Sequence, residues 1–298
     1  MTTISDYRDE RLRKLAEIKD LGIDPYPAHS NRDTKISEIL NNFEQFDQKE
    51  VTIAGRIVAI RSFGKLAFVK IRDYFGEIQL FMKQSTEEKE GFLTVKSLKL
   101  LDLGDFIEAK GLVGRSQTGE ISVFTDAVRL LTKSLRPLPG RDGFTNKEER
   151  YRRRYVDMNV NPEVRERLVR RSRFWQATRD YMNEHGFIEI NTPILEHTTG
   201  GADAAPFVTH MDALDEDFYL RISQELPLKR LLGAGFEKVY DIGPRFRNEG
   251  VDDEHLPEHI AFESYAAFED YRDGMDFYEE MIKYVAMKTW GTLQFTVG

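Results

Sequence analysis

Apolar residues near the start of the chain recur with the period of an α-helix. Four of them are spaced three residues apart with charged residues between them, and Gly22 follows where a helix would end. This pattern predicts one amphipathic helix over residues 5–21, with an apolar side formed by Leu12, Leu15, Ile18 and Leu21.

Five runs of alternating apolar and polar residues follow, and they predict five β-strands. A longer segment, residues 86–101, separates the third run from the fourth and predicts a helix. Five short strands with a helix after the third are typical of an OB-fold, a small barrel whose second and third strands commonly carry oligonucleotides or sugars. The five runs are residues 51–62, 66–73, 77–83, 105–115 and 121–131.

Alternation along the second and third of these strands places aromatic side chains outside the expected barrel. Phe68 and Lys70 face outward from the second strand, and Gln79 and Phe81 face outward from the third. Bases stacked on such rings contribute about 1–3 kcal/mol each, and an amide can read a base edge. The pattern favours a stacking surface for unpaired nucleotides, unless the N-terminal helix or another domain covers the rings.

A linker rich in proline and glycine, SLRPLPGRDG, follows the barrel and indicates a second domain. A chain of 298 residues is long enough for two domains with a core each. We divide the chain into an N-terminal helix and lead-in (1–49), the barrel (50–134), the linker (135–146) and a second domain (147–298).

The second domain is expected to combine helices and strands. Asn161 and Pro162 are suited to the start of a long helix, which runs to about His185. Residues 187–195 then predict a strand, and residues 218–223 predict a further strand before the next helix.

Composition limits the chemistry that the chain can carry. The absence of cysteine excludes disulfides and thiolate zinc sites, so a metal would need oxygen or imidazole ligands. The net charge of -8 argues against nonspecific binding to nucleic acid, but it leaves room for a local basic face. The sequence has neither a signal-like start nor an uncharged apolar run of about 18 residues, which predicts a cytoplasmic protein with no membrane partner.

The segment RFRNEGVDDEHLPEHIAFESYAAFEDY combines charges with aromatic residues between two runs that both predict strands. A period of two places Arg245, Arg247 and Glu249 on one face of the first strand, and Glu263 and Tyr265 on one face of the second. If the two strands are antiparallel, these charged side chains point toward the same ligand. The alternative is that the charges only face solvent at the tip of a hairpin.

Two further features of the second domain leave their roles open. The paired glycines in TTGGADAAPF allow the backbone to approach a ligand closely, or they form a plain turn. Glu225 lies near the start of a predicted helix, where its carboxylate can bind a ligand or complement the helix dipole.

The combination of FRNEG, HLPEH and ESYAAFEDY, preceded by RISQELPLKR, GFIEINTPIL and the OB-like domain, resembles the class II lysyl-tRNA synthetases. The resemblance covers essentially the whole chain. It implies an α+β multidomain protein with a five-stranded OB-fold β-barrel, followed by a partial class II synthetase antiparallel-sheet catalytic domain. The implied reaction is ATP-dependent activation of lysine and its transfer to tRNA(Lys), with Mg2+ as cofactor, in a homodimer formed through residues 163–193.

The resemblance also implies roles for individual residues. Arg247 would act in catalysis by bridging the α-phosphate and the substrate carboxylate, because its planar fork suits such anions. Glu263 and Tyr265 would meet the ε-ammonium of lysine, which supplies the cation that a buried carboxylate needs. The implied residues are Arg247, Glu249, His255 and His259 for ATP, Gly201, Glu225, Arg247, Glu263 and Tyr265 for lysine, and Arg61, Phe68, Gln79 and Phe81 for the anticodon.

The sequence departs from the family pattern in three respects. His259 stands where the family usually has a phenylalanine that stacks on adenine. Leu256 replaces a usual asparagine, and Ala127, with Asp126 beside it, stands where an acidic residue often contributes to anticodon reading. The family's third signature, a glycine-rich strand and helix with an arginine, is absent. We therefore expect an N-terminal portion of a longer enzyme, inactive by itself and without the Mg2+ ligands.

Two alternatives remain open at this level. An aspartyl- or asparaginyl-tRNA synthetase would share the barrel and the second signature, although the pair formed by Glu263 and Tyr265 resembles the lysine pattern. A noncatalytic tRNA-binding protein would keep the barrel for RNA and use the remaining domain to dimerise.

Overall fold

The structure of the chain, a computed structural model, describes residues 4–85, 89–140, 144–252 and 255–296. The chain divides into two compact units, Met1–Asn161 and Pro162–Gly298. Each unit is described by itself.

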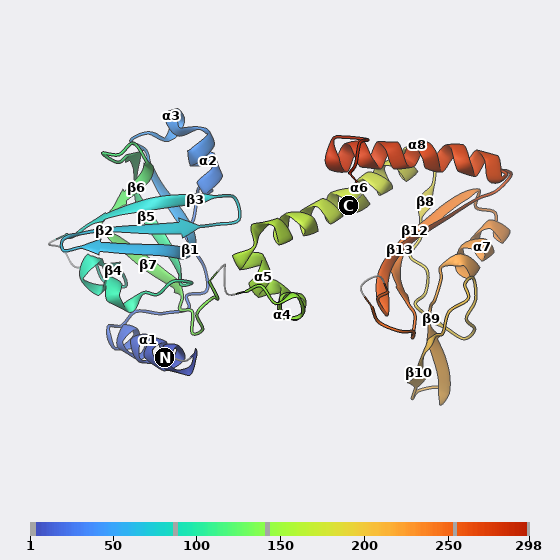
Figure 1. Cartoon of the computed structure of the whole chain (residues 1–298), viewed down its shortest axis with the longest axis horizontal. Helices are drawn as coiled ribbons and strands as arrows, with labels where there is room; N and C mark the ends of the chain where they lie inside the picture. The colour runs from blue at the N-terminus through green and yellow to red at the C-terminus, as the bar shows by residue number, and fades with distance from the viewer. Residues whose placement is uncertain (1–3, 86–88, 141–143, 253–254, 297–298) are drawn as a thin grey trace. The chain divides into compact units, whose positions relative to one another are not determined.

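The first unit is a closed β-barrel (Figure 1). Its strands follow the order β1-β2-β3-β6-β5-β7-β4, and an additional antiparallel pairing of β1 with β5 closes the barrel. This arrangement confirms the predicted OB-fold. The strands are β1 (Glu50–Phe63), β2 (Leu66–Arg72), β3 (Glu77–Lys83), β4 (Leu93–Thr94), β5 (Phe106–Arg115), β6 (Ile121–Thr125) and β7 (Ala127–Thr132).

Short helices accompany the barrel. Helix α1 (Ile4–Asp20) precedes it and confirms the predicted amphipathic helix, and α2 (Ile36–Asn41) and α3 (Phe43–Phe46) lead into β1. After the barrel come α4 (Lys147–Arg152) and α5 (Arg154–Val160).

Two details of the barrel differ from the sequence-based expectation. The fifth run is not one strand, because Asp126 separates β6 from β7. The segment after β3 contains no α-helix among its described residues, 89–101. Gly91 there adopts a φ of 79°, the short strand β4 pairs with β7, and a 3-10 helix, η1 (Val95–Leu100), follows.

The barrel core contains the residues that alternation placed inside. Ala67, Val69 and Ile71 of β2 are fully buried, as are Leu80 and Met82 of β3. Helix α1 does not lie over the outer face of these strands. It contacts the η1 segment after β4. Arg11 donates to the Ser134 carbonyl at 3.0 Å and Lys14 pairs with Asp102 at 2.8 Å, and these contacts hold the helix there.

The second unit packs helices against a small mixed sheet. Helices α6 (Pro162–Glu184) and α8 (Tyr271–Trp290) pack on each other, and a cluster of buried aromatic and aliphatic residues joins them to β12 (Lys238–Phe246) and β13 (Glu258–Ala266). Strand β8 (Ile188–Glu189) pairs parallel with β12. A second small sheet consists of β9 (Leu195–Glu196), β10 (Phe207–Met211) and β11 (Glu216–Leu220), and α7 (Glu225–Gly233) follows it.

Three strand predictions in the second unit extend too far. Residues 187–195 form only the short strands β8 and β9, because the chain leaves the first sheet and enters the second between them. Strand β11 ends at Leu220, before the predicted end at residue 223. Strand β12 ends at Phe246, so Arg247 and Glu249 lie in the connection to β13 and not on the strand.

A buried ion pair connects the segments of the second unit. Arg221 and Asp241 are each 2% exposed, and Arg221 Nη1 lies 2.9 Å from Asp241 Oδ2. Thr192 completes the contact, because its hydroxyl accepts from Arg221 at 2.7 Å and donates to Asp241 at 2.5 Å. Arg221 Nε also donates to the Pro244 carbonyl at 2.7 Å. Each partner depends on the others, since a buried charge without its partner is strongly unfavourable.

We expect Asp241→Asn to lower the free energy of unfolding of the second unit by about 3–5 kcal/mol, because Arg221 would remain as a buried cation. Urea titration followed by tryptophan fluorescence measures this effect. The signal is specific for the second unit, because both tryptophans of the chain, Trp175 and Trp290, belong to it.

Glu279→Gln is the matched control for this experiment. Glu279 pairs with Lys283 at 2.6 Å on the exposed surface of α8, where ion pairs contribute little. Equal unfolding midpoints for the two variants would contradict a structural role of the Arg221–Asp241 pair.

Candidate functional site

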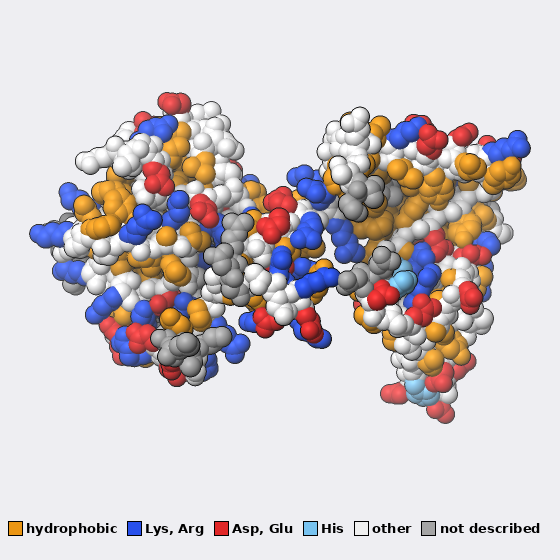
Figure 2. All heavy atoms as spheres, viewed as in Figure 1, with side chains coloured by type: hydrophobic (Ala, Val, Ile, Leu, Met, Phe, Trp, Pro, Cys, Tyr) orange, Lys and Arg blue, Asp and Glu red, His pale blue; other side chains and the backbone are white. Residues whose placement is uncertain are grey.

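The four barrel residues predicted to contact nucleotides lie together on one outer face. In the strand registers, Arg61 is opposite Phe68, Phe68 is opposite Phe81, and Lys70 is opposite Gln79. The rings of Phe68 and Phe81 contact each other edge to face, with centroids 5.1 Å apart. Hydrophobic and basic side chains lie side by side on the visible surface of the barrel unit (Figure 2).

Two further phenylalanines extend this aromatic surface. The Phe63 ring lies 6.1 Å from the Phe68 ring, and the Phe124 ring lies 5.1 Å from the Phe81 ring. Sequence reasoning missed both residues. Phe124 reaches the row because β6 pairs parallel with β3, a long-range pairing that no local pattern reveals.

Polar groups surround the aromatic surface. A small cavity of about 100 Å³ is lined by Phe68, Gln79 and the cations Arg61 and Lys70. The Gln79 amide donates to the Ser122 hydroxyl at 3.0 Å, which fixes its orientation. At the position where an acidic residue was expected, Ala127 is buried and the carboxylate of Asp126 pairs with Lys89 at 2.7 Å.

In the second unit, Glu263 is the centre of a polar group in the middle of the β12–β13 hairpin. Its carboxylate accepts from the Ser223 hydroxyl at 2.9 and 3.1 Å, and it pairs with Arg245 at 2.9 Å. The sequence-based site residues did not include Ser223. The contact with Glu263 joins residues 40 positions apart, so the local pattern carried no signal for it.

Glu225, Tyr265 and Gly201 lie together near the start of α7. Tyr265 forms a hydrogen bond to Glu225, and Glu225 also pairs with Lys229 at 2.6 Å. Gly201 has a φ of 83°, and a Cβ atom at this position would lie 2.5 Å from the Cβ of Glu225. Only glycine therefore fits beside Glu225, which explains one of the paired glycines.

The electrostatics of this group follow from burial and the two carboxylates. Burial, then the charges of Glu263 and Glu225, raise the pKa of Tyr265. A hydrogen bond from Lys229 lowers the pKa of Glu225. Tyr265 is therefore a neutral donor, and Glu225 an anionic acceptor, at neutral pH.

Arg247 and Glu249 lie in the connection between β12 and β13. The backbone of Arg247 donates to the Pro257 carbonyl at 2.9 Å, and the Arg247 Nε is buried with no hydrogen-bond partner among the described residues. Glu249 accepts from the Ala205 backbone at 3.3 Å, which ties it to the glycine-containing loop.

The two predicted histidines differ in their surroundings. His255 is exposed and its ring bonds to Asp252 of the same loop at 2.8 Å. His259 is half-buried on β13, opposite Arg245. The structure therefore places His259 on the hairpin with Arg245, and His255 in the loop.

No group of three or more histidine, aspartate or glutamate side chains in the described part of the chain could hold a metal ion. We therefore derive no step through Mg2+. Among the helices in the described ranges, none is long and apolar enough to cross a membrane.

Comparison with known proteins identifies the family. Residues 146–296 match the family described as tRNA synthetases class II (D, K and N). The chain belongs to this family. Residues 51–131 match the OB-fold nucleic acid binding domain, in agreement with the barrel.

Individual relatives of this synthetase chain are similar over nearly all of it. A lysine–tRNA ligase of Carboxydothermus hydrogenoformans is 48% identical over 96% of the chain and 58% of its own length. Those of Fervidobacterium nodosum and Thermotoga maritima are 42% and 40% identical over 98% of the chain, and over 58% and 59% of their own lengths. The chain therefore spans somewhat more than half the length of these relatives.

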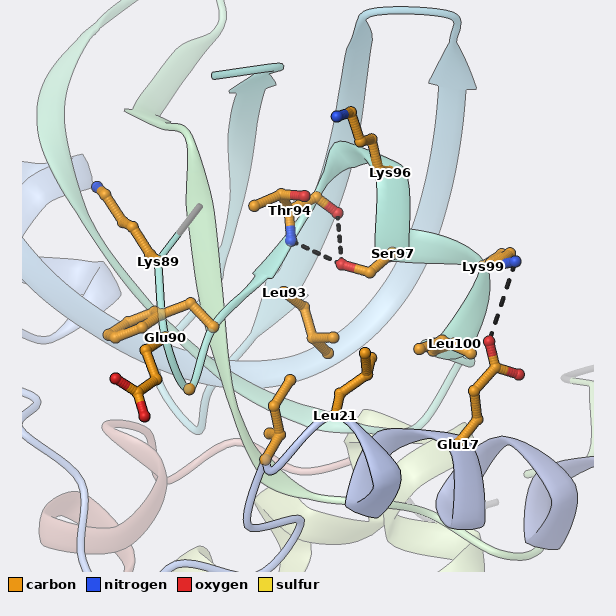
Figure 3. Close-up of a pocket in the computed structure, with 13 residues that line it drawn as sticks. Glu17, Leu21, Lys89, Glu90, Leu93, Thr94, Lys96, Ser97, Lys99 and Leu100 are labelled. Atoms are coloured by element: carbon orange, nitrogen blue, oxygen red, sulfur yellow. Dashed lines mark hydrogen bonds and ion pairs between the residues drawn. The ribbon is translucent and has the colours of Figure 1, made fainter. Parts of the chain in front are cut away.

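The synthetase chain has a large cavity in the barrel unit that no predicted site residue lines. It measures about 530 Å³ and lies between α1 and the β4–η1 segment (Figure 3). Leu21, Leu93 and Leu100 contribute apolar side chains, and Lys99 lies 4.0 Å from Glu17 across the gap. The lysine side chains here point in several directions and form no common anion site.

A second cavity of about 490 Å³ lies between residues 190–198 and α7. Glu196 lines it, and the Glu196 Oε2 is buried with no hydrogen-bond partner among the described residues. Burial raises the pKa of Glu196, although the charges of Arg221 and Arg230 oppose the shift. The ionised carboxylate therefore lowers the stability of the folded unit at neutral pH.

We expect Glu196→Gln to stabilise the second unit at pH 7.5 by about 1 kcal/mol or less, because the carboxylate is only partly removed from water. A carboxyl group with a raised pKa in the folded state is protonated there first as the pH falls. The difference between wild type and variant should therefore shrink as the pH approaches 4.

Thermal unfolding at both pH values measures the effect of Glu196→Gln. Glu237→Gln, at an exposed glutamate of the same unit, is the matched control and should change neither value. A stabilisation by Glu196→Gln that persists undiminished at pH 4 would contradict the assignment.

Proposed function

We propose that the chain is the part of a lysine–tRNA ligase that binds tRNA, ATP and lysine, in an enzyme that activates lysine as lysyl-adenylate and transfers it to tRNA(Lys). The observation that carries this proposal is that the Ser223 hydroxyl joins the two carboxylate residues, because it donates to Glu263 at 2.9 Å and accepts from the Glu225 backbone at 3.1 Å. Tyr265 lies two residues after Glu263 on the same face of β13. Lysine has two ammonium groups, and a site with two separated carboxylates can pair with both. Aspartate and asparagine each have only one ammonium group, so they could pair with only one of the two carboxylates.

In this proposal Glu225 accepts from the α-ammonium of lysine, with the backbone at Gly201 beside it. Glu263 and the hydroxyl oxygen of Tyr265 both accept from the ε-ammonium. A carboxylate offers about four lone-pair positions, and Ser223 and Arg245 leave room for a further donor on Glu263.

Arg247 is proposed to bind the groups that every aminoacyl adenylate shares. The Arg247 Nε is a buried donor without a partner among the described residues. An α-phosphate and a substrate carboxylate are anions whose geometry suits the guanidinium fork. Charge concentrates on these oxygens as they approach each other, so the catalytic contribution of Arg247 would be largest there.

The remaining ATP contacts are proposed on the same connection and hairpin. Glu249 would accept from the adenine amino group, His259 would stack on the ring, and His255 would contact the phosphates. Mg2+ is used with ATP by this family in general, and it would accompany ATP here.

The proposed partners follow from the same assignment. The anticodon of tRNA(Lys) would lie on the barrel face of Arg61, Phe68, Gln79 and Phe81. A homodimer would form through residues 163–193 in the cytoplasm. Exposed apolar side chains at Leu168 (46%) and Ile188 (50%) support a protein contact along this segment.

The test uses an enzyme of the length found in the relatives. We expect Glu263→Gln to lower kcat/KM for lysine, because the ε-ammonium would enter the site unpaired. The expected decrease corresponds to a loss of about 3–5 kcal/mol of transition-state stabilisation. Activity toward norleucine, an uncharged isostere, should change little. ATP–pyrophosphate exchange with lysine, aspartate, asparagine and norleucine measures both. Arg247→Ala should lower exchange with every amino acid.

Glu258→Gln on the same strand is the matched control, because Glu258 is exposed at the start of β13. Equal losses of Glu263→Gln toward lysine and norleucine, or no loss, would refute the role of Glu263. Exchange stimulated by aspartate or asparagine in place of lysine would assign the enzyme to the other members of the family.

For the barrel, we expect Phe68→Ala to weaken binding of tRNA(Lys) by about 1–3 kcal/mol, because one stacked base loses its ring. Filter binding with the 298-residue chain measures the affinity. Phe75→Ala is the control, since Phe75 is 48% exposed in the loop between β2 and β3, beyond the aromatic row. Unchanged affinity in Phe68→Ala would count against anticodon binding at this face.

A further inference from the structure

Phe63 is an exposed aromatic ring that contacts the proposed nucleotide-binding face. It is 63% exposed and is the last residue of β1, directly before the turn to β2. A single exposed phenylalanine is common on protein surfaces and needs no explanation. Phe63 differs because its ring contacts Phe68, with centroids 6.1 Å apart, and so continues the row formed by Phe68, Phe81 and Phe124.

The opposite end of this row is half-buried on the outer face and packs against β5. The Phe124 ring lies over Gly114, where a Cβ atom would approach the ring to 3.1 Å. The tilted contact between Phe124 and Phe81 therefore supports Phe81 from the neighbouring strand β6. Phe124 is a positioning residue, whereas Phe63 at the other end has its ring in solvent.

The ring orientations determine which kind of nucleic acid fits. The Phe63 and Phe68 planes meet at 74°, and the Phe68 and Phe81 planes meet at 84°. Bases stacked on neighbouring rings would therefore lie nearly perpendicular to each other. A duplex keeps its bases parallel, so only an unpaired strand with splayed bases can use these rings together.

Two lysine residues lie beside the turn between β1 and β2, next to Phe63. Phe63 is opposite Leu66 in the β1–β2 register, and Leu66 is opposite Lys83 of β3. Lys65 and Lys83 are both exposed beside the turn. Their ammonium groups can neutralise phosphates next to a base on Phe63.

We infer that Phe63 is a nucleotide-stacking residue, which extends the surface of Phe68 and Phe81 by one further unpaired base. The inference rests on the proposed binding of RNA by the barrel. The ligand is a single-stranded stretch with splayed bases, and stacking makes the contact tolerant of base identity.

Fluorescence anisotropy with labelled decauridylate tests the inference on the 298-residue chain. We expect Phe63→Ala to weaken binding by about 5- to 140-fold, which corresponds to about 1–3 kcal/mol. Phe63→Trp should retain binding and Phe63→Leu should lose it, because stacking needs an aromatic face. Phe75→Ala is the matched control for removal of an exposed ring.

Four results would overturn the inference. Binding by Phe63→Leu at the wild-type level would indicate apolar cover instead of stacking. An equal loss on a blunt RNA duplex would remove the preference for unpaired nucleotides. Unchanged binding in Phe63→Ala, while Phe68→Ala binds weakly, would refute the role of Phe63 and leave the proposed function intact. If the wild-type chain binds neither decauridylate nor tRNA(Lys), both the inference and the proposed anticodon binding fail.

Discussion

The buried contact of Arg221, Asp241 and Thr192 holds together the segments that form the hairpin site. Each residue comes from a different segment, and the three meet in an environment almost without water. A charge in such a place is tolerated only with its partner and its hydrogen bonds in position. Arg221 is next in the chain to the segment that contains Ser223 and Glu225, so fixing Arg221 also fixes the start of α7.

The same contact determines what Glu263 can meet. Asp241 is opposite Glu263 in the β12–β13 register, so the buried pair and the proposed ligand carboxylate are on neighbouring positions of one hairpin. Ser223 reaches Glu263 because Arg221 holds the start of α7 against this hairpin. The proposed lysine site thus consists of a rigid buried part and an accessible part, in which Glu263, Tyr265 and Glu225 face a ligand.

In the barrel unit, strand pairing fixes the positions of the proposed binding residues. Phe68 and Phe81 lie opposite each other because β2 and β3 form an antiparallel hairpin, and Phe124 joins them because β6 adds to β3 in parallel. The buried side of β2 and β3 is purely apolar, so a shift of register by one residue would move the rings of Phe68 and Phe81 into the core. The core therefore fixes the position of the aromatic row.

The sequence by itself determined the parts of this protein that depend on local periodicity. Alternation located β2 and β3 and oriented Phe68, Gln79 and Phe81, because a side chain on a strand points to one face or the other. Family motifs suggested residues of the hairpin site. Tertiary structure alone decided that Phe63 and Phe124 join the row, that Ser223 and Arg245 contact Glu263, and that residues 187–195 divide between two sheets. These features arise from contacts between residues far apart in the chain, and a periodic pattern records only which face a residue occupies, not which residue lies opposite it.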